Sequence, residues 1–174
     1  MSGTLIKIEV DDREIREALS RLASKVRNLA PAMKNIGEYL QRSTWERFGA
    51  QKDPQGKPWA KLKPGTLARK KTSKILIESS GLRDSIHYEA SSDSVSVGTD
   101  KIYAAIHQFG GKTSPHTIRP SRKKALFWPG ASHPVGSVNH PGSQIPARPF
   151  LGVSDEDKSE ILDILRDHVH SGEK

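Results

Sequence analysis

The sequence predicts an α+β protein in which an antiparallel sheet packs against N-terminal and C-terminal helices, with long extended loops between these elements. Two observations support this fold class. Apolar side chains recur at helical spacing in three segments, 15–29, 33–48 and 161–169. Apolar and polar residues alternate, as they do in half-buried strands, at 4–10 and 86–98.

The N-terminal part is expected to hold a strand followed by two helices. Residues 4–10 form the strand, and a pair of aspartates then suits the start of a helix that runs to about Leu29. Pro31 suits the first turn of the second helix, and Gly49 suits its end. The second helix is expected to bury Met33, Ile36, Leu40, Thr44 and Phe48, with Trp45 beside them.

Proline and glycine predict a loop at 51–64. Trp59 is an apolar residue in this charged loop, so it either anchors the loop to the core or lies exposed as a partner contact. The basic run 66–74 can form a helical turn. Residues 86–98 predict a β-hairpin with its turn at 91–93.

The apolar stretch 102–111 predicts a short helix that enters the core. Gly110 and Gly111 then stop this helix, because glycine tolerates the left-handed conformation of a C-terminal cap. The side chains at helical spacing, and therefore expected on the buried face, are Ile102, Tyr103, Ile106 and Phe109.

A long loop is expected at 112–143, which is rich in Pro, Gly, Ser and His. Within it, 117–119 and 125–128 can form short strands, and 145–152 continues as an extended segment. Ser154 is expected to cap a last helix that ends at Gly172. The apolar stripe of that helix comprises Ile161, Leu162, Leu165 and Val169.

Charge is distributed unevenly along the chain. Residues 51–74 hold eight basic side chains and one acidic one, and residues 111–150 hold six basic side chains and no acidic one. Residues 151–174 hold seven acidic and three basic side chains. Such a chain can bind nucleic acid, or can bind its own neighbour, with positive loops against a negative C-terminal segment.

Composition argues against several classes of protein. The absence of cysteine excludes a disulfide framework and thiolate chemistry. No apolar run approaches the length of a membrane span, and the N-terminus lacks the pattern of a secretory signal. We therefore expect a soluble protein that is made in a cytoplasm and has no membrane partner.

The histidines raise the question of a metal site, since His116, His133 and His140 lie in one loop and His107 just before it. Their spacing matches no metal-binding pattern, and the loop has no carboxylate to act as a base. The sequence also lacks an HExxH motif, a Walker loop, a GxGxxG fingerprint and a nucleophile elbow. We expect neither an enzyme nor a protein with a metal or cofactor.

A nucleic-acid-binding protein is a second class that the net charge of +8 allows. The chain contains no recognised nucleic-acid-binding module, so its contacts would reach phosphate groups without reading the sequence. The candidates for such contacts are Lys61, Lys63, Arg69, Lys70 and Lys71, together with Arg122, Lys123 and Lys124.

Four segments carry a family resemblance. They are TWERFGAQKDPQGKPWAKLKPGTLARK (Thr44 to Lys70), ILIESSGLRDSI (Ile75 to Ile86), VGTDKIYAAIHQFGG (Val97 to Gly111) and IPARPFLGVSDED (Ile145 to Asp157). In content, order and spacing they resemble the virion morphogenesis, or tail completion, family of Mu-like and P2-like tailed phages and prophages. The resemblance implies a single domain over 1–174, with a variable long loop at 112–143.

The resemblance also implies a structural phage protein that completes the tail and takes part in head–tail joining, typically as a ring. Its partners would be other copies of itself and tail or neck proteins. Its place would be the tail or neck of a virion assembled in the host bacterial cytoplasm. The alternative is a basic nucleic-acid-binding protein of phage or prophage origin, with non-specific and salt-dependent DNA contact.

A ring interface repeats head to tail, so each subunit needs two different complementary surfaces. The basic loops and the acidic C-terminal helix are candidates, although the basic loops can alternatively line a channel for DNA. Phe127 and Trp128 favour a buried contact for the long loop. The candidate interface residues are therefore Trp59, Arg122, Lys123, Lys124, Phe127 and Trp128.

Overall fold

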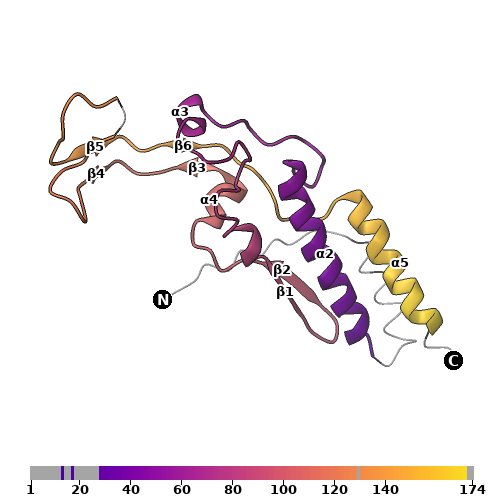
Figure 1. The fold of residues 1–174 in the computed structure, drawn as a ribbon. Coiled ribbons are helices and arrows are strands. Elements are labelled where there is room, and N and C mark those ends of the chain that lie inside the picture. The colour runs from indigo at the N-terminus through magenta and orange to yellow at the C-terminus, as the bar shows by residue number, and fades with distance from the viewer. Residues whose placement is uncertain (1–12, 14–16, 18–27, 129, 172–174) are drawn as a thin grey trace.

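The computed structural model describes residues 13, 17, 28–128 and 130–171 (Figure 1). The strand expected at 4–10 lies outside the described residues, as does most of the helix expected before Leu29. The two described residues within that helix, Arg13 and Glu17, are helical.

The central element is helix α2, Ala30–Ala50, which begins with proline near its N-terminus as expected. Its C-terminus lies one residue beyond the expected Gly49, and Gln51 takes the left-handed conformation there with φ of 60°. The residues predicted for the buried face are buried, apart from Leu40, which is half-buried. Trp45 remains partly exposed, and its indole N–H donates to the carbonyl of Arg83.

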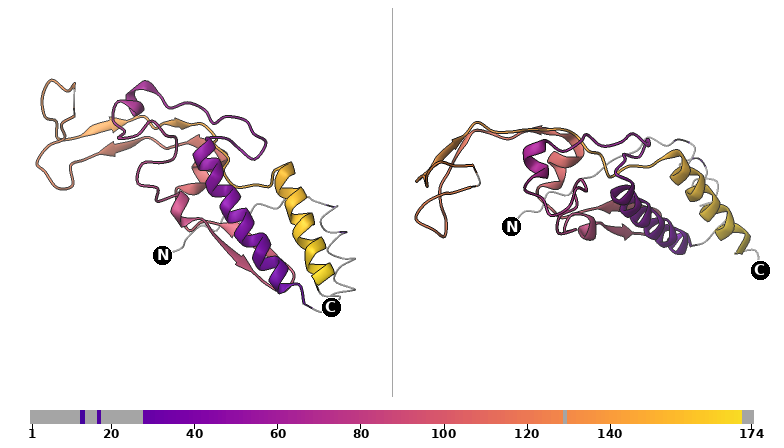
Figure 2. Two further views of the ribbon diagram at one scale, coloured as in Figure 1. Left: turned by 45° about the vertical axis from the view of Figure 1, so that its right-hand side comes forward. Right: turned by 45° about the horizontal axis from the view of Figure 1, so that its top comes forward.

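Helix α2 lies between a β-hairpin and a second long helix (Figures 1 and 2). The hairpin consists of β1, His87–Ala90, and β2, Val95–Gly98, which pair antiparallel as predicted. The second helix is α5, Asp155–Ser171. The fold is therefore α+β, with α2 packed on a two-stranded antiparallel sheet and α5 packed on α2.

Two hydrophobic clusters hold these layers together, and α2 contributes to both. One cluster joins the N-terminal half of α2 to α5 through Ala32, Met33, Ile36, Ile161 and Leu165. The other joins the C-terminal end of α2 to the loops and comprises Phe48, Trp59, Ile75, Leu82, Ile86, Ala104, Phe150 and Leu151.

Trp59 belongs to the second cluster and is only 4% exposed. Its ring packs edge-on against Phe48, and its indole N–H donates to the carbonyl of Pro149 at 2.8 Å. Trp59 therefore anchors the 51–64 loop to the core, and its side chain is not part of an exposed partner surface. The basic run that follows begins with a single helical turn, α3, Pro64–Leu67.

The expected burial of the 102–111 helix is wrong, although the helix exists as α4, Ala104–Phe109. Ile102 is 74% exposed and Phe109 is 64% exposed, whereas Ala104 and Gln108 are buried. The side-chain amide of Gln108 accepts from the backbone N–H groups of residues 150 and 151 and donates to the carbonyl of Leu151. Because these buried backbone groups need partners, the polar face of α4 turns inward.

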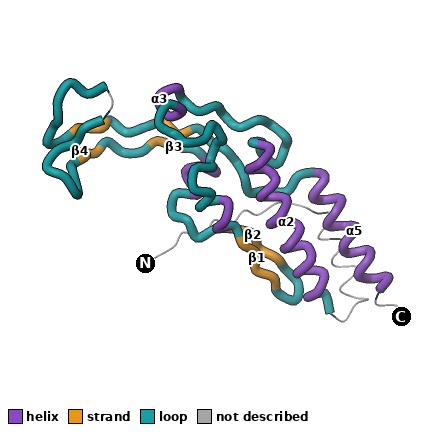
Figure 3. Tube along the Cα trace, viewed as in Figure 1, coloured by secondary structure: helices purple, strands orange, loops and turns teal. Residues whose placement is uncertain are grey.

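The long loop expected at 112–143 is largely a two-stranded arm that projects from the body (Figures 1 and 3). Near the body, β3, Gly111–Lys112, pairs antiparallel with β6, Gln144–Ile145. Further out, β4, His116–Ile118, pairs with β5, Val138–His140, in the same register. The strand expected at 117–119 thus begins one residue earlier, as β4.

The outer end of the arm is irregular. The second short strand expected in the loop, at 125–128, is reduced to a single bridge between Leu126 and Val135. At the base of the arm, Gly110 has φ of 72°, and a Cβ there would lie 2.7 Å from the backbone nitrogen of Ala147. The glycine that ends α4 thus also lets the two sides of the arm's base approach each other.

Candidate interaction surfaces

The arm carries five of the six residues predicted for an interface. Arg122, Lys123 and Lys124 are exposed near its outer end. Phe127 is 67% exposed and Trp128 is 38% exposed. Exposed aromatic side chains are enriched at protein contact surfaces, and so is arginine.

The acidic surface is the outer face of α5, at the opposite end of the molecule from the arm (Figures 1 and 2). Ile161 and Leu165 bury the inner face of this helix against α2. Helical periodicity then places the acidic residues outside. Those that are exposed are Asp155, Glu156, Glu160, Asp163 and Asp167.

A buried ion pair fixes the start of α5 against α2. Asp157 accepts from the guanidinium of Arg47 and from the hydroxyl of Ser43, and its backbone N–H donates to the capping Ser154 at 3.1 Å. Burial alone would raise the pKa of Asp157, but the hydrogen bonds from Ser154 and Ser43 and the charge of Arg47 lower it overall. Ser154 thus caps the helix as predicted.

Three of the four apolar side chains that the sequence pattern assigned to the core at 102–109 are exposed. They are Ile102 and Tyr103, just before α4, and Phe109 at its end, whereas Ile106 is half-buried. Helical periodicity could not have predicted that these three residues are exposed. The buried face of α4 is set by the contact of Gln108 with a segment more than 40 residues away.

The residues of the 61–71 segment predicted to contact DNA phosphate differ in exposure. Lys61, Lys63, Arg69 and Lys71 are exposed. Lys70 is instead held inward, where its ammonium group forms an ion pair with Glu78 at 2.7 Å and donates to the carbonyl of Ile77. Its charge is therefore already neutralised within the chain.

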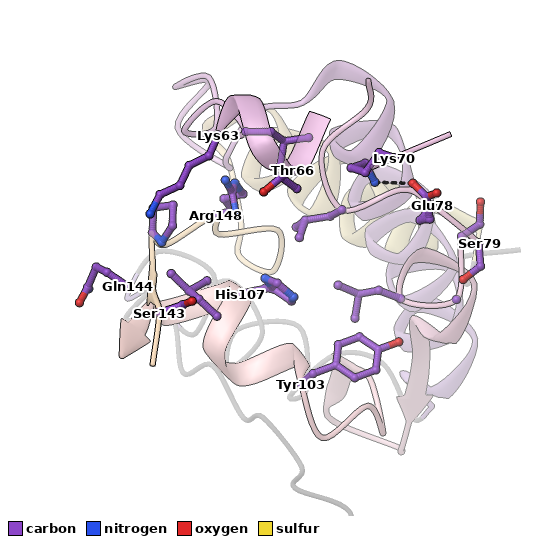
Figure 4. A pocket seen from close by; sticks show the side chains of 17 residues that line it. Lys63, Thr66, Lys70, Glu78, Ser79, Tyr103, His107, Ser143, Gln144 and Arg148 are labelled. Carbon is purple, nitrogen blue, oxygen red and sulfur yellow. Dashed lines mark ion pairs between the residues drawn. The ribbon is translucent and has the colours of Figure 1, made fainter. Parts of the chain in front are cut away.

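A pocket of about 490 Å³ opens at the base of the arm, between α3, α4 and the 78–82 turn (Figure 4). His107 and Arg148 point into it, and Lys63 and Tyr103 lie at its edge. The Nδ1 atom of His107 is buried and has no hydrogen-bond partner among the residues that the structure describes. Burial, followed by the charge of Arg148, lowers the pKa of His107, so the imidazole is neutral at pH 7. Sequence reasoning missed this pocket.

The four histidines considered for a metal site do not come together as one group. His116 and His140 stack across the β4–β5 pair with ring centroids 5.1 Å apart, whereas His107 lies in the pocket. Within the described part of the chain, no three metal-ligating side chains gather in one place. No helix among the described residues is long and apolar enough to cross a membrane.

These features define an α+β protein with a basic projecting arm at one end and an acidic helix at the other. The chain belongs to the phage virion morphogenesis family, whose model matches residues 10–170. It is 33% identical to "Mu-like prophage FluMu G protein 2" of Haemophilus influenzae, over 94% of this chain and 96% of that protein. It is 30% identical to "Putative capsid assembly protein G" of Escherichia phage Mu, over 94% of each chain. No solved structure matches the chain.

Proposed function

We propose that this virion morphogenesis protein is a structural subunit, not an enzyme, that completes the phage tail and helps to join it to the head. In this proposal it forms a ring within the tail or neck of the virion, after assembly in the host bacterial cytoplasm, and it contacts other tail or neck proteins. Family membership supports the general role in virion assembly.

The observation that carries the ring proposal is the placement of two oppositely charged surfaces at opposite ends of one molecule (Figure 2). A surface that binds a different surface on the next copy produces a head-to-tail contact, which closes into a ring or extends into a filament. The arm supplies Arg122, Lys123, Lys124 and the exposed aromatic pair. The outer face of α5 supplies the carboxylates that complement them.

A pair of charge-reversed variants tests this contact. The first carries Arg122→Glu, Lys123→Glu and Lys124→Glu, and the second carries Glu160→Lys, Asp163→Lys and Asp167→Lys. Light scattering at low and moderate salt should show oligomers for the native chain and monomers for each variant alone. An equimolar mixture should regain oligomers, because each variant then offers the surface that complements the other.

A matched control carries Lys57→Glu, Lys61→Glu and Lys71→Glu, which reverses three exposed charges outside the arm. This variant should assemble like the native chain. Equal masses for the native chain and both charge-reversed variants at every concentration would contradict the proposed contact. The same control addresses the alternative function, because a nucleic-acid-binding protein would lose affinity for random duplex DNA when Lys61 and Lys71 become acidic.

A further inference from the structure

The pocket at the base of the arm has an excess of positive charge in its wall. Arg148 is only 6% exposed, and it donates to the carbonyls of Ala60 and Lys61 through two of its nitrogens. A guanidinium has five N–H groups, so donors remain after these two bonds. Lys63 adds a second cation that pairs with no acidic residue in the described part of the chain. Lys70 and Glu78 neutralise each other.

The imidazole of His107 is a further polar group in the pocket, and one of its ring nitrogens lacks a hydrogen bond among the described residues. This nitrogen, Nδ1, is buried, and leaving a buried polar group unpaired is unfavourable. In the neutral imidazole this nitrogen can carry the proton and donate it to an acceptor. An anionic acceptor between His107 and Arg148 would satisfy both side chains at once (Figure 4).

The remaining walls determine what kind of anion fits. Leu62, Leu76, Leu82 and Ile145 line the pocket, so the group that carries the anion needs an apolar stem. A carboxylate at the end of a glutamate side chain has such a stem. A phosphate of duplex DNA lies on a broad, stiff backbone and does not reach a guanidinium that is nearly buried.

We propose that this pocket binds the carboxylate of a glutamate or aspartate side chain from a protein partner, through Arg148, His107 and Lys63. The hydroxyl of Tyr103, at the edge of the pocket, is placed to contact the same segment. A second copy of this chain can supply the carboxylate from α5, and another virion protein can supply it equally well. The pocket binds the same chemical group whether or not the chain forms a ring.

The probe is an acetylated, amidated tripeptide, Leu-Glu-Leu, titrated into the native protein with isotope-labelled histidine. The imidazole signals of His107, assigned with the variant His107→Gln, should shift on binding. The pKa of His107 should rise in the complex, because a bound carboxylate stabilises the imidazolium. Replacing glutamate by glutamine in the probe should weaken binding about tenfold, the loss expected for one charge-assisted hydrogen bond.

Lys63→Ala should weaken binding of the probe, whereas Lys57→Ala, an exposed lysine outside the pocket, should not. Equal binding of the glutamate and glutamine probes, or an unchanged pKa of His107 at saturation, would overturn the proposal. Inorganic phosphate and random duplex DNA serve as competitors, and displacement of the tripeptide by DNA at moderate salt would also overturn it.

A dilution series identifies the source of the natural ligand. If α5 of a second copy occupies the pocket, the His107 signals of the free protein should change with concentration and stop changing in the Glu160→Lys, Asp163→Lys, Asp167→Lys variant. Concentration-independent signals, with the tripeptide still bound, assign the pocket to another virion protein. A native protein that stays monomeric at every concentration but still binds the tripeptide would count against the ring and leave the pocket proposal standing.

Discussion

At the scale of single residues, Asp157 connects the start of α5 to the C-terminal part of α2. Its side chain is 2% exposed and its partner Arg47 is 9% exposed, so both charges are out of water. Arg47 also donates through Nη1 to the carbonyls of Phe150 and Gly152. Removing one partner of such a buried ion pair destabilises the protein strongly, because the other charge is then left uncompensated.

The variant Asp157→Asn should therefore lower the free energy of unfolding by about 3 kcal/mol. The pKa of Asp157 in the folded protein lies below its ordinary value of 3.8. Its ionised form thus stabilises the fold above about pH 4, and this stabilisation is lost as the pH falls through the folded-state pKa. Thermal melts between pH 6 and pH 2 should show a smaller loss of Tm at acidic pH for the variant than for the native protein.

The exposed pair of Asp163 and Arg166 provides the control. Because exposed ion pairs contribute little to stability, Asp163→Asn should leave both the Tm and its pH dependence nearly unchanged. Identical acid profiles for the native protein and Asp157→Asn would show that the buried pair does not control acid stability.

At the scale of secondary-structure elements, the contact between α2 and β1 depends on a glycine. A Cβ placed on Gly37 would lie 2.3 Å from the ring of Tyr88. Glycine in the middle of a helix normally costs about 0.5–1 kcal/mol relative to alanine. The close approach of the tyrosine ring explains why this position of α2 has no side chain.

Gly37→Ala should accordingly destabilise the protein by about 1–3 kcal/mol, as overpacking does, despite the better helix propensity of alanine. In the background of Tyr88→Ala the same change should stabilise the protein by about 0.5–1 kcal/mol, since only the propensity remains. Denaturant unfolding of the four proteins in this double-mutant cycle measures both effects. An effect of the same sign in both backgrounds would contradict the role of the ring.

At the scale of the whole molecule, the arm and the body differ in how much apolar surface they bury. Among the described residues, every buried apolar side chain lies outside the arm, 111–145. The arm is held to itself by the β3–β6 and β4–β5 pairs. We infer that the arm serves contacts to other molecules and adds little to the stability of the core.

Replacing residues 113–143 by an Asn-Gly turn, which favours a tight hairpin, should leave the Tm within a few degrees of the native value. The same deletion should abolish the proposed oligomers, because the basic surface is removed. Differential scanning calorimetry and light scattering on one preparation measure both quantities. A large fall in Tm would show that the arm contributes to the core after all.

Much of this fold was predictable because its signals are local. The stripe of α2, its proline start, the Ser154 cap of α5 and the hairpin at 86–98 all follow from residues close together in sequence. The exposure of Arg122, Lys123 and Lys124 follows from their charge, because lysine and arginine are rarely buried without a partner.

Other features were not predictable because they depend on distant partners. Helical spacing marked Phe109 and Ile102 as buried, yet the structure exposes them because Gln108 satisfies backbone groups of residues 150 and 151. The ion pair between Lys70 and Glu78 was likewise not predictable, because the two residues meet across a turn.

The sequence by itself determined the fold class, most helices and the hairpin, the uneven charge and, through four segments, the resemblance to the virion morphogenesis family. Only the tertiary structure decided which face of α4 is buried, that Trp59 belongs to the core, and that His107 and Arg148 share a pocket. The physical reason is that periodicity and capping reflect neighbours within a few residues. The burial of a polar group instead depends on hydrogen-bond partners brought together from remote parts of the chain.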